Sequence, residues 1–150
     1  MVLTLELPEI YPVVMLSATA LPFITSTVMG GQVMSARKTF KVAYPNLYAV
    51  PGVHEKADEF NRVQRGHQNI FETLPSVMGF TLIGGLKYPR VAIFLAAAYC
   101  IGNFYYLLGY ADTKKDVKGA RYTKPLAVLK PIGMIGGLIN CVVACAMMMM

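Results

Sequence analysis

The sequence predicts an all-α integral membrane protein, a single domain over residues 1–150 built as a bundle of four transmembrane helices. Two observations carry this prediction. Hydrophobic residues make up 55% of the chain and charged residues only 15%, with a mean hydropathy of +0.49. A soluble domain of this size buries only about 70% of its surface, so it cannot hide that much apolar area. The charges are also clustered, and they leave long apolar stretches between them.

The first span is expected over residues 12–34, which carry no charge and exceed the about 20 residues needed to cross a bilayer. Within it, Pro22 is expected to bend the helix. The basic segment 35–42 follows at the membrane edge, and the Pro- and Gly-containing stretch 43–58 reads as a loop. A second helix is expected over residues 60–86. Only its second half is apolar, so hydropathy alone underestimates how well this helix qualifies as a membrane span.

The third span is expected over residues 91–110. The connection 87–90 is very short, so the second and third helices should be antiparallel neighbours. Residues 112–130 read as a polar loop. The last span is expected over residues 131–150, and its glycines should permit close contact with another helix; these are Gly133, Gly136 and Gly137.

The distribution of cations predicts the orientation. Four helices place both termini on one side of the membrane. Six cations lie between the first span and Arg65, and six more lie in the loop 112–130. The opposite side has only Lys87 and Arg90. Lys and Arg favour the cytosolic side, so the basic loops should be cytosolic and the termini lumenal.

Composition also argues against some partners. The basic residues flank apolar spans and form no soluble basic face, so no nucleic acid is expected to bind. The three cysteines lie in apolar runs, which favours packing over a disulfide framework or a metal site; they are Cys100, Cys141 and Cys145.

The polar start of the second helix is the most informative stretch. At about 100° per residue, Arg62, Arg65, Asn69 and Glu72 fall within about a quarter of the helix circumference. Charged groups at membrane depth usually face a cavity, a ligand or a bundle interior. The alternative is a capping and snorkelling network at a helix end.

Two tyrosines of the third span reach the same membrane boundary. Tyr106 and Tyr110 are four residues apart and so share one helix face. Together with the cations they indicate a hydroxyl-lined pocket for a small polyanionic ligand, open sideways to lipid. Two alternatives remain open: an aromatic belt for the tyrosines, and attraction to anionic lipid for the loop cations.

Several motifs resemble one known family. Residues 62–69, followed by Glu72 and Pro75, resemble the signature of the MAPEG superfamily of membrane glutathione enzymes. The segments 36–45 and 84–90 and the Tyr106 to Tyr110 pattern are also similar to it. Within the superfamily, the sequence most resembles the microsomal glutathione S-transferases of type three.

The resemblance implies a homotrimer of four-helix subunits that binds glutathione between neighbouring subunits near the cytosolic face. By matching position, one subunit would line this site with Arg65, Asn69, Glu72, Tyr106 and Tyr110. Arg37 and His67 would reach in from the neighbour. Arginines suit the two carboxylates of glutathione and Glu72 suits its ammonium. Its thiolate, the nucleophile, would be stabilised by a nearby cation.

The thiol-activating cation implied by the resemblance falls in a stretch that aligns poorly, so Lys118 and Arg121 are both candidates. Two further positions depart from the family pattern. Asn103 stands where several relatives have arginine, and Thr73 stands where the leukotriene-forming relative has tyrosine. These departures affect the expected activity more than the expected fold.

The function implied is that of a glutathione transferase or peroxidase, which joins glutathione to lipophilic electrophiles or reduces lipid hydroperoxides. The endoplasmic reticulum is the expected location, with the mitochondrial outer membrane as the alternative. A second hypothesis is a non-catalytic binding or structural subunit of a membrane assembly. A transporter is a weaker hypothesis, since the four spans show no clear internal repeat.

Overall fold

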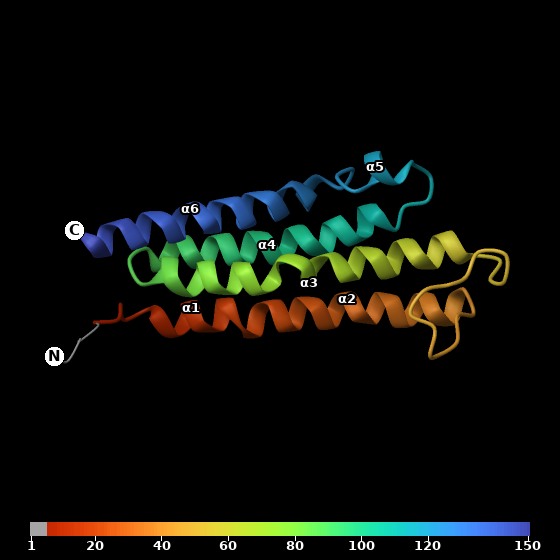
Figure 1. Cartoon of the computed structure of the whole chain (residues 1–150), viewed down its shortest axis with the longest axis horizontal. Helices are drawn as coiled ribbons and strands as arrows, with labels where there is room; N and C mark the ends of the chain where they lie inside the picture. Colours follow the sequence, from red (N-terminus) through yellow and green to blue (C-terminus); the bar gives the residue numbers. More distant parts are fainter. Residues whose placement is uncertain (1–5) are drawn as a thin grey trace.

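A computed structural model describes residues 6–150, in which long helices lie side by side along one axis (Figure 1). In chain order the elements are α1 (Tyr11–Ala18), α2 (Ala20–Thr39), α3 (Ala57–Gly85), α4 (Pro89–Tyr110), α5 (Val117–Ala120), the 3-10 turn η1 (Pro125–Val128) and α6 (Leu129–Met149). The prediction of an all-helical chain is therefore confirmed for the part of the chain that the structure describes.

The first predicted span is helical but divided. Helices α1 and α2 meet at Thr19, whose backbone departs from helical geometry at φ −119° and ψ −68°. Pro22 explains the break, because its ring clashes with the carbonyl four residues earlier, that of Ala18, and it has no N–H to donate. The helix then continues beyond the predicted end and carries Arg37 and Lys38 in its last turn.

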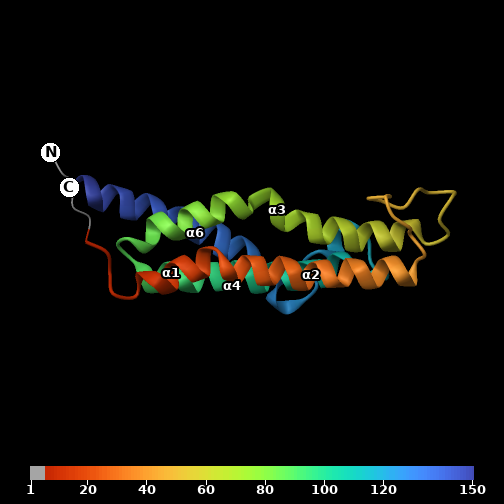
Figure 2. The same cartoon turned by 90° about the horizontal axis from the view of Figure 1, so that it is seen from below.

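Helix α3 has 29 residues, which corresponds to a length of about 43 Å. Pro75 lies inside it, and the helix bends in its middle (Figure 2). By length and hydropathy, three stretches of the described chain qualify as membrane spans: Tyr11–Thr39, Pro89–Tyr110 and Pro125–Met149. The predicted second helix is present as α3, which begins three residues before the expected start at residue 60 and ends one residue before the expected end at residue 86. Its polar first half keeps it outside that group.

Helices α4 and α6 pack with almost no space between their backbones. A Cβ atom at Gly133 would collide with the backbone of Leu95 and Tyr99, and one at Gly102 would collide with the backbone of Leu129 and Lys130. The predicted close contact at the glycines of the last span is confirmed for Gly133. As a result, the first residues of α6 are fixed against the middle of α4.

The core between the helices is mainly apolar, and the hydroxyl of its largest fully buried side chain is paired. Tyr99 is fully buried, and its hydroxyl donates to the carbonyl oxygen of Ile70 at 2.9 Å. The hydroxyl of Thr73 lies 2.8 Å from the same phenol oxygen. Such pairing is what burial of a hydroxyl requires.

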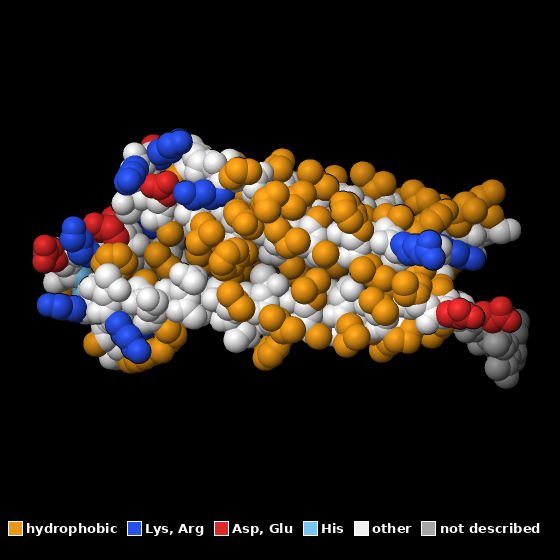
Figure 3. Space-filling view, turned by 180° about the vertical axis from the view of Figure 1, so that it is seen from behind, with side chains coloured by type: hydrophobic (Ala, Val, Ile, Leu, Met, Phe, Trp, Pro, Cys, Tyr) orange, Lys and Arg blue, Asp and Glu red, His pale blue; other side chains and the backbone are white. Residues whose placement is uncertain are grey.

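The two ends of the bundle differ. The start of α1, the end of α6 and the α3–α4 turn share one end, while the loop 40–56 and the segment around α5 share the other (Figure 1). Charged side chains gather near the two ends, and a broad apolar band lies between them (Figure 3). The expectation that residues 112–130 form a loop needs correction, because this segment contains α5 and η1 and its last two residues begin α6. Lys130 is therefore a buried helical residue.

Candidate functional site

A charge pair lies on the outward face of α3. Arg65 Nη1 lies 2.6 Å from Glu72 Oε1, with the two side chains 44% and 47% exposed. The residues are seven apart, which places them two turns apart on one face of the helix. Asn69 lies between them and donates its side-chain amide to the carbonyl oxygen of Arg65 at 3.0 Å. Three predicted site residues therefore share this face.

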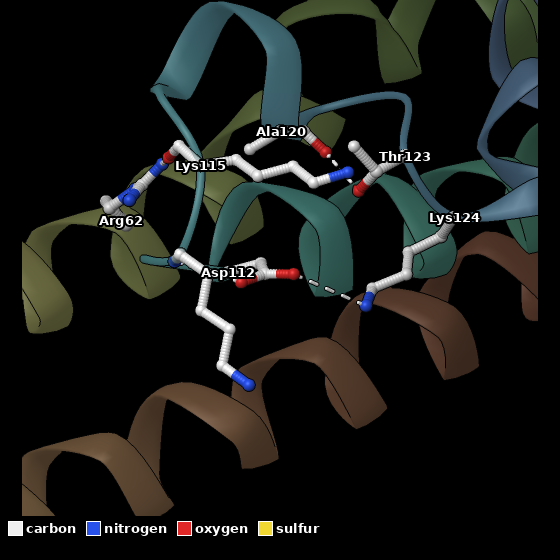
Figure 4. Close-up of polar contacts among 7 residues, drawn as sticks. Arg62, Asp112, Lys115, Ala120, Thr123 and Lys124 are labelled. Atoms are coloured by element: carbon white, nitrogen blue, oxygen red, sulfur yellow. Dashed lines mark hydrogen bonds and ion pairs between the residues drawn. The ribbon is translucent and has the colours of Figure 1, made fainter.

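Arg62 does not take part in the contacts between Arg65, Asn69 and Glu72, although its position in α3 places it near them. Its side chain is only 5% exposed, and Nη2 donates to the carbonyl oxygen of Lys115 at 2.8 Å. Figure 4 shows this contact between α3 and the segment that follows α4. In the same segment Asp112 accepts an ion pair from Lys124 at 3.6 Å. These contacts hold residues 112–124 against the end of the bundle.

That fixed segment presents Arg121 to the tyrosines of α4. Tyr106 is 3% exposed, and its ring lies 5.7 Å from that of Tyr110 and 5.3 Å from that of Tyr122. Contact with the hydroxyl of Tyr106 raises the pKa of the Arg121 guanidinium above its ordinary value, so this cation stays charged at every physiological pH. Its Nε atom is buried without a partner within the described residues.

The two predicted candidates for the activating cation thus differ. Lys118 is exposed, and only its backbone N–H is used, donating to Asp116 at 3.0 Å as a helix cap. Arg121 is half-buried beside Tyr106 and has an unused donor. The geometry therefore favours Arg121 as the cation available to an anionic ligand.

A cleft of about 340 Å³ opens beside this cluster. Arg65 and Tyr110 line it from α3 and α4, and the remaining lining residues are Tyr48, Asp58, Asn61, Arg62 and Val117. The hydroxyl of Tyr48 donates to Gln68 and so fixes the loop 40–56 against α3. The predicted residues Arg65 and Tyr110 therefore face one crevice, which carries two guanidinium groups.

Arg37 and His67 lie away from this crevice within the same chain. Arg37 Nη1 donates to the carbonyl oxygen of Asn46 at 2.7 Å, and its guanidinium lies over the rings of Tyr44 and Phe60 at 4.7 Å and 5.0 Å. His67 faces Gly30 of α2, with its Nε2 atom buried and unpartnered within the described residues. One chain thus brings together part of the predicted site and leaves these two residues on another side.

The two positions that depart from the family pattern are both internal. Asn103 is fully buried and donates to the carbonyl oxygen of Tyr99 at 2.8 Å, one turn earlier in α4. Thr73 pairs with the hydroxyl of Tyr99. Neither side chain lines the crevice beside Arg65.

Lys130 is the residue that sequence reasoning missed. Its ammonium lies 3.9 Å from the centre of the Tyr106 ring, and the side chain is 8% exposed. The sequence placed it among the loop cations, because the apolar run begins only at Pro131. The Lys124-Pro125 step was the available signal, since proline is favoured in the first turn of a helix.

Residues 15–149 match the MAPEG family. This range takes in α2, α3, α4 and α6 completely, the second half of α1, and every candidate residue described above.

Proposed function

Because the chain belongs to the MAPEG family, we propose that it is a membrane-bound glutathione transferase with glutathione peroxidase activity. Its function would be like that of the microsomal glutathione S-transferases of type three. It would join the thiol of glutathione to lipophilic electrophiles or reduce lipid hydroperoxides. Glutathione supplies the nucleophilic thiolate when bound, and the chain binds and orients it.

The observation that carries this proposal is the pairing of Arg65 with Glu72 beside Tyr110, whose ring lies against the Tyr106 that Arg121 contacts. Glutathione has two carboxylates, one ammonium and one thiol. A guanidinium binds a carboxylate through two parallel hydrogen bonds, and a carboxylate accepts from an ammonium. Arg65 and Glu72 would exchange their mutual contact for contacts with these groups. Because both side chains are about half exposed, that exchange costs little desolvation.

Arg121 would act on the thiol. Its Nε–H is a buried hydrogen-bond donor that has no acceptor within the described residues. A fixed cation lowers the pKa of a nearby thiol and so raises the population of the reactive thiolate. The contacts of Arg62 and Asp112 with the same segment would keep this cation in place during turnover.

We also propose that α3 is a fourth span and that three chains assemble. The charged half of α3 is costly to expose to lipid, which favours covering it with a neighbouring subunit. Arg37 and His67 would then contribute to the site of the adjacent chain. The basic loops would be cytosolic and the termini lumenal, in the endoplasmic reticulum or the mitochondrial outer membrane.

An apolar groove would give the lipophilic partner a route from the bilayer. An apolar groove of about 310 Å³ runs between α2 and α4. Its lining includes Ile24, Val28, Phe104 and Tyr105, of which Tyr105 lies one position from Tyr106. The apolar lining of this groove supports a hydrophobic second substrate but does not select one particular compound.

Substitution of Arg65 tests the proposal. Arg65→Ala in the purified protein should abolish glutathione-dependent conjugation and peroxidase turnover, while Lys38→Ala, which removes an exposed cation from the end of α2, should retain both. Unchanged turnover in Arg65→Ala contradicts the proposal. Glutathione binding should be measured by calorimetry in the same samples, so that loss of binding is separated from loss of chemistry.

Asn103 favours a second candidate, a non-catalytic binding subunit. It is neutral, fully buried and bonded to its own helix, so it contributes no charge at a position where the resemblance expects arginine. The thiolate absorbance that appears on adding glutathione separates the two candidates. Binding with no thiolate signal and no turnover favours the second.

A further inference from the structure

Lys130 holds its ammonium in an unusual place for a lysine at the start of a membrane helix. The side chain is 8% exposed, and its Nζ lies over the ring of Tyr106 at 3.9 Å from the centre. A lysine at a membrane edge normally extends toward water and keeps its charge hydrated. This one instead stacks on a tyrosine of the candidate site.

The backbone explains why the side chain lies there. At Gly102 there is no space for even a methyl group, because the backbone of Leu129 and Lys130 lies directly against it. Gly102 and Tyr106 are one helical turn apart on the same face of α4. The side chain of Lys130 therefore starts at Gly102 and runs along α4 to Tyr106.

The charges around Lys130 do not balance. Within residues 6–150 no carboxylate forms a salt bridge with it. The charged groups that act on its ammonium are one carboxylate, Glu72, and two guanidinium groups, Arg65 and Arg121. Glu72 is already paired with Arg65 at 2.6 Å.

The four groups together carry a net charge of about two positive units, from three cations and one carboxylate. A buried charge is costly unless it is paired. Stacking of an ammonium on an aromatic ring recovers only about 0.5–2 kcal/mol. It therefore accounts for the position of Lys130 but leaves its buried charge without an anionic partner within residues 6–150. An anionic ligand would supply that partner.

We propose that Lys130 acts through Tyr106 to stabilise the deprotonated thiol of glutathione in the candidate site. This inference rests on the proposed function. Glutathione carries about one net negative charge with its thiol protonated and two with the thiolate, so the deprotonated form matches the four groups. The thiol proton passes to water. A cation on the ring face favours negative charge at the ring oxygen, which makes the Tyr106 hydroxyl a stronger donor to an anion.

In this arrangement Lys130 is a positioning residue and Tyr106 is the group in contact with the ligand. The other groups that face Tyr106 are Arg121, Tyr110 and Tyr122. Arg121 acts at the hydroxyl of Tyr106, and Lys130 acts at its ring face. The two cations therefore reinforce each other from different directions.

The experiment measures the thiolate absorbance of glutathione bound to the purified full chain as a function of pH. Lys130→Met keeps the length and apolar stem of the side chain and removes its charge. We expect the ratio of thiolate to thiol in this variant to be about tenfold lower at neutral pH than in the unchanged protein, which is one pKa unit in the bound thiol. Lys130→Arg keeps the charge and should retain the original pH profile.

Two further measurements separate this effect from a loss of structure. S-methylglutathione has no thiol proton, so calorimetry should give the same affinity for Lys130→Met and the unchanged protein. Tyr106→Phe keeps the ring beneath the ammonium and removes the hydroxyl, and it should shift the thiolate profile in the same direction. The two substitutions combined should produce less than the sum of their separate effects.

The outcomes are distinct. An unshifted profile in either Lys130→Met or Tyr106→Phe overturns the inference and leaves the proposed function intact. Should Lys130→Met not fold, Lys130→Gln, which also removes the charge and keeps most of the stem, takes its place in the same measurement. Glutathione binding without thiolate in the unchanged protein overturns the inference and supports the non-catalytic candidate. If the unchanged protein gives neither a heat of glutathione binding nor a thiolate signal, the proposed function itself is contradicted.

Discussion

The guanidinium of Arg62 donates to the carbonyl oxygen of Lys115 at 2.8 Å, which connects α3 to a segment 53 positions later in the chain. The side chain of Arg62 is almost fully buried, so water competes less for this donor than it would at the surface. Gly109 reinforces the connection, because the carbonyl oxygen of Ala120 occupies the space that a Cβ atom would take. Together they fix the backbone that leads into Arg121.

Arg62→Met should therefore loosen this segment. Loss of a hydrogen bond from a charged donor costs about 1.5–3 kcal/mol. Hydrogen exchange measured in detergent should become faster at the backbone amides of residues 112–121 and stay unchanged in α6. Lys118→Ala, which removes an exposed side chain, is the control. Equal protection in Arg62→Met and the unchanged protein would show that other contacts hold the segment.

The two candidates for the activating cation can be separated directly. Arg121→Ala should lower glutathione-dependent turnover by about a hundredfold, the usual loss when one fixed donor to a developing charge is removed. Lys118→Ala should leave turnover unchanged, because its side chain points to solvent and only its backbone N–H is bonded. Steady-state rates at saturating glutathione measure both. The reverse ranking would assign the role to Lys118.

Much of the fold could be predicted because membrane helices can be identified from their apolar composition. The charge-free runs predicted the three apolar spans, and the short connection expected at 87–90 is observed as the turn 86–88 between α3 and α4. The polar start of α3 was also placed on a helix. Each of these features depends on residues close together in the sequence.

The partners of individual side chains could not be predicted in the same way. Helical spacing correctly placed Arg62 near Arg65 on α3. It does not predict which other segment packs against each side chain, and Arg62 in fact donates to the carbonyl oxygen of Lys115. Lys130 was missed because a 3-10 turn at Pro125 starts the helix earlier than the apolar run does. Both errors come from contacts between distant segments.

Acid should loosen the segment 112–124 through Asp112. The pKa of this carboxyl is lowered, first by the backbone N–H of Lys114 and further by the ammonium of Lys124. A carboxyl whose pKa is lower in the folded protein than in the unfolded chain stabilises the folded protein at pH values above its unfolded pKa, here 3.8. This contribution is lost as the pH falls through the folded pKa. Faster proteolysis of this segment by an acid-active protease should appear at that pH. Asp112→Asn should show the faster rate at neutral pH and little further change with acid.

Gly102 should tolerate no larger residue. Gly102→Ala would place a methyl group where the backbone of Lys130 lies, so α4 and α6 would have to separate. Overpacking of this kind costs about 1–3 kcal/mol, and the thermal midpoint in detergent should fall accordingly. Gly119→Ala, at a position open to solvent, should change stability by about 0.5 kcal/mol at most. A midpoint for Gly102→Ala equal to that of Gly119→Ala would contradict the close helix contact.

Arg37 presents the sharpest test of how the site is assembled, because its donor Nη1 is already used by the loop carbonyls of Asn46 and Val42. Arg37→Lys keeps the charge but loses the forked geometry and the stacking on Tyr44 and Phe60. If Arg37 serves only its own loop, the variant should show faster proteolysis within residues 40–56 and an unchanged KM for glutathione. If it also reaches the site of a neighbouring subunit, as the proposed trimer requires, KM should rise about tenfold or more, since a single charged contact to a ligand carboxylate contributes about 1.5–3 kcal/mol. Limited proteolysis and steady-state kinetics on the same preparation decide between these outcomes, and an unchanged KM would remove Arg37 from the proposed site.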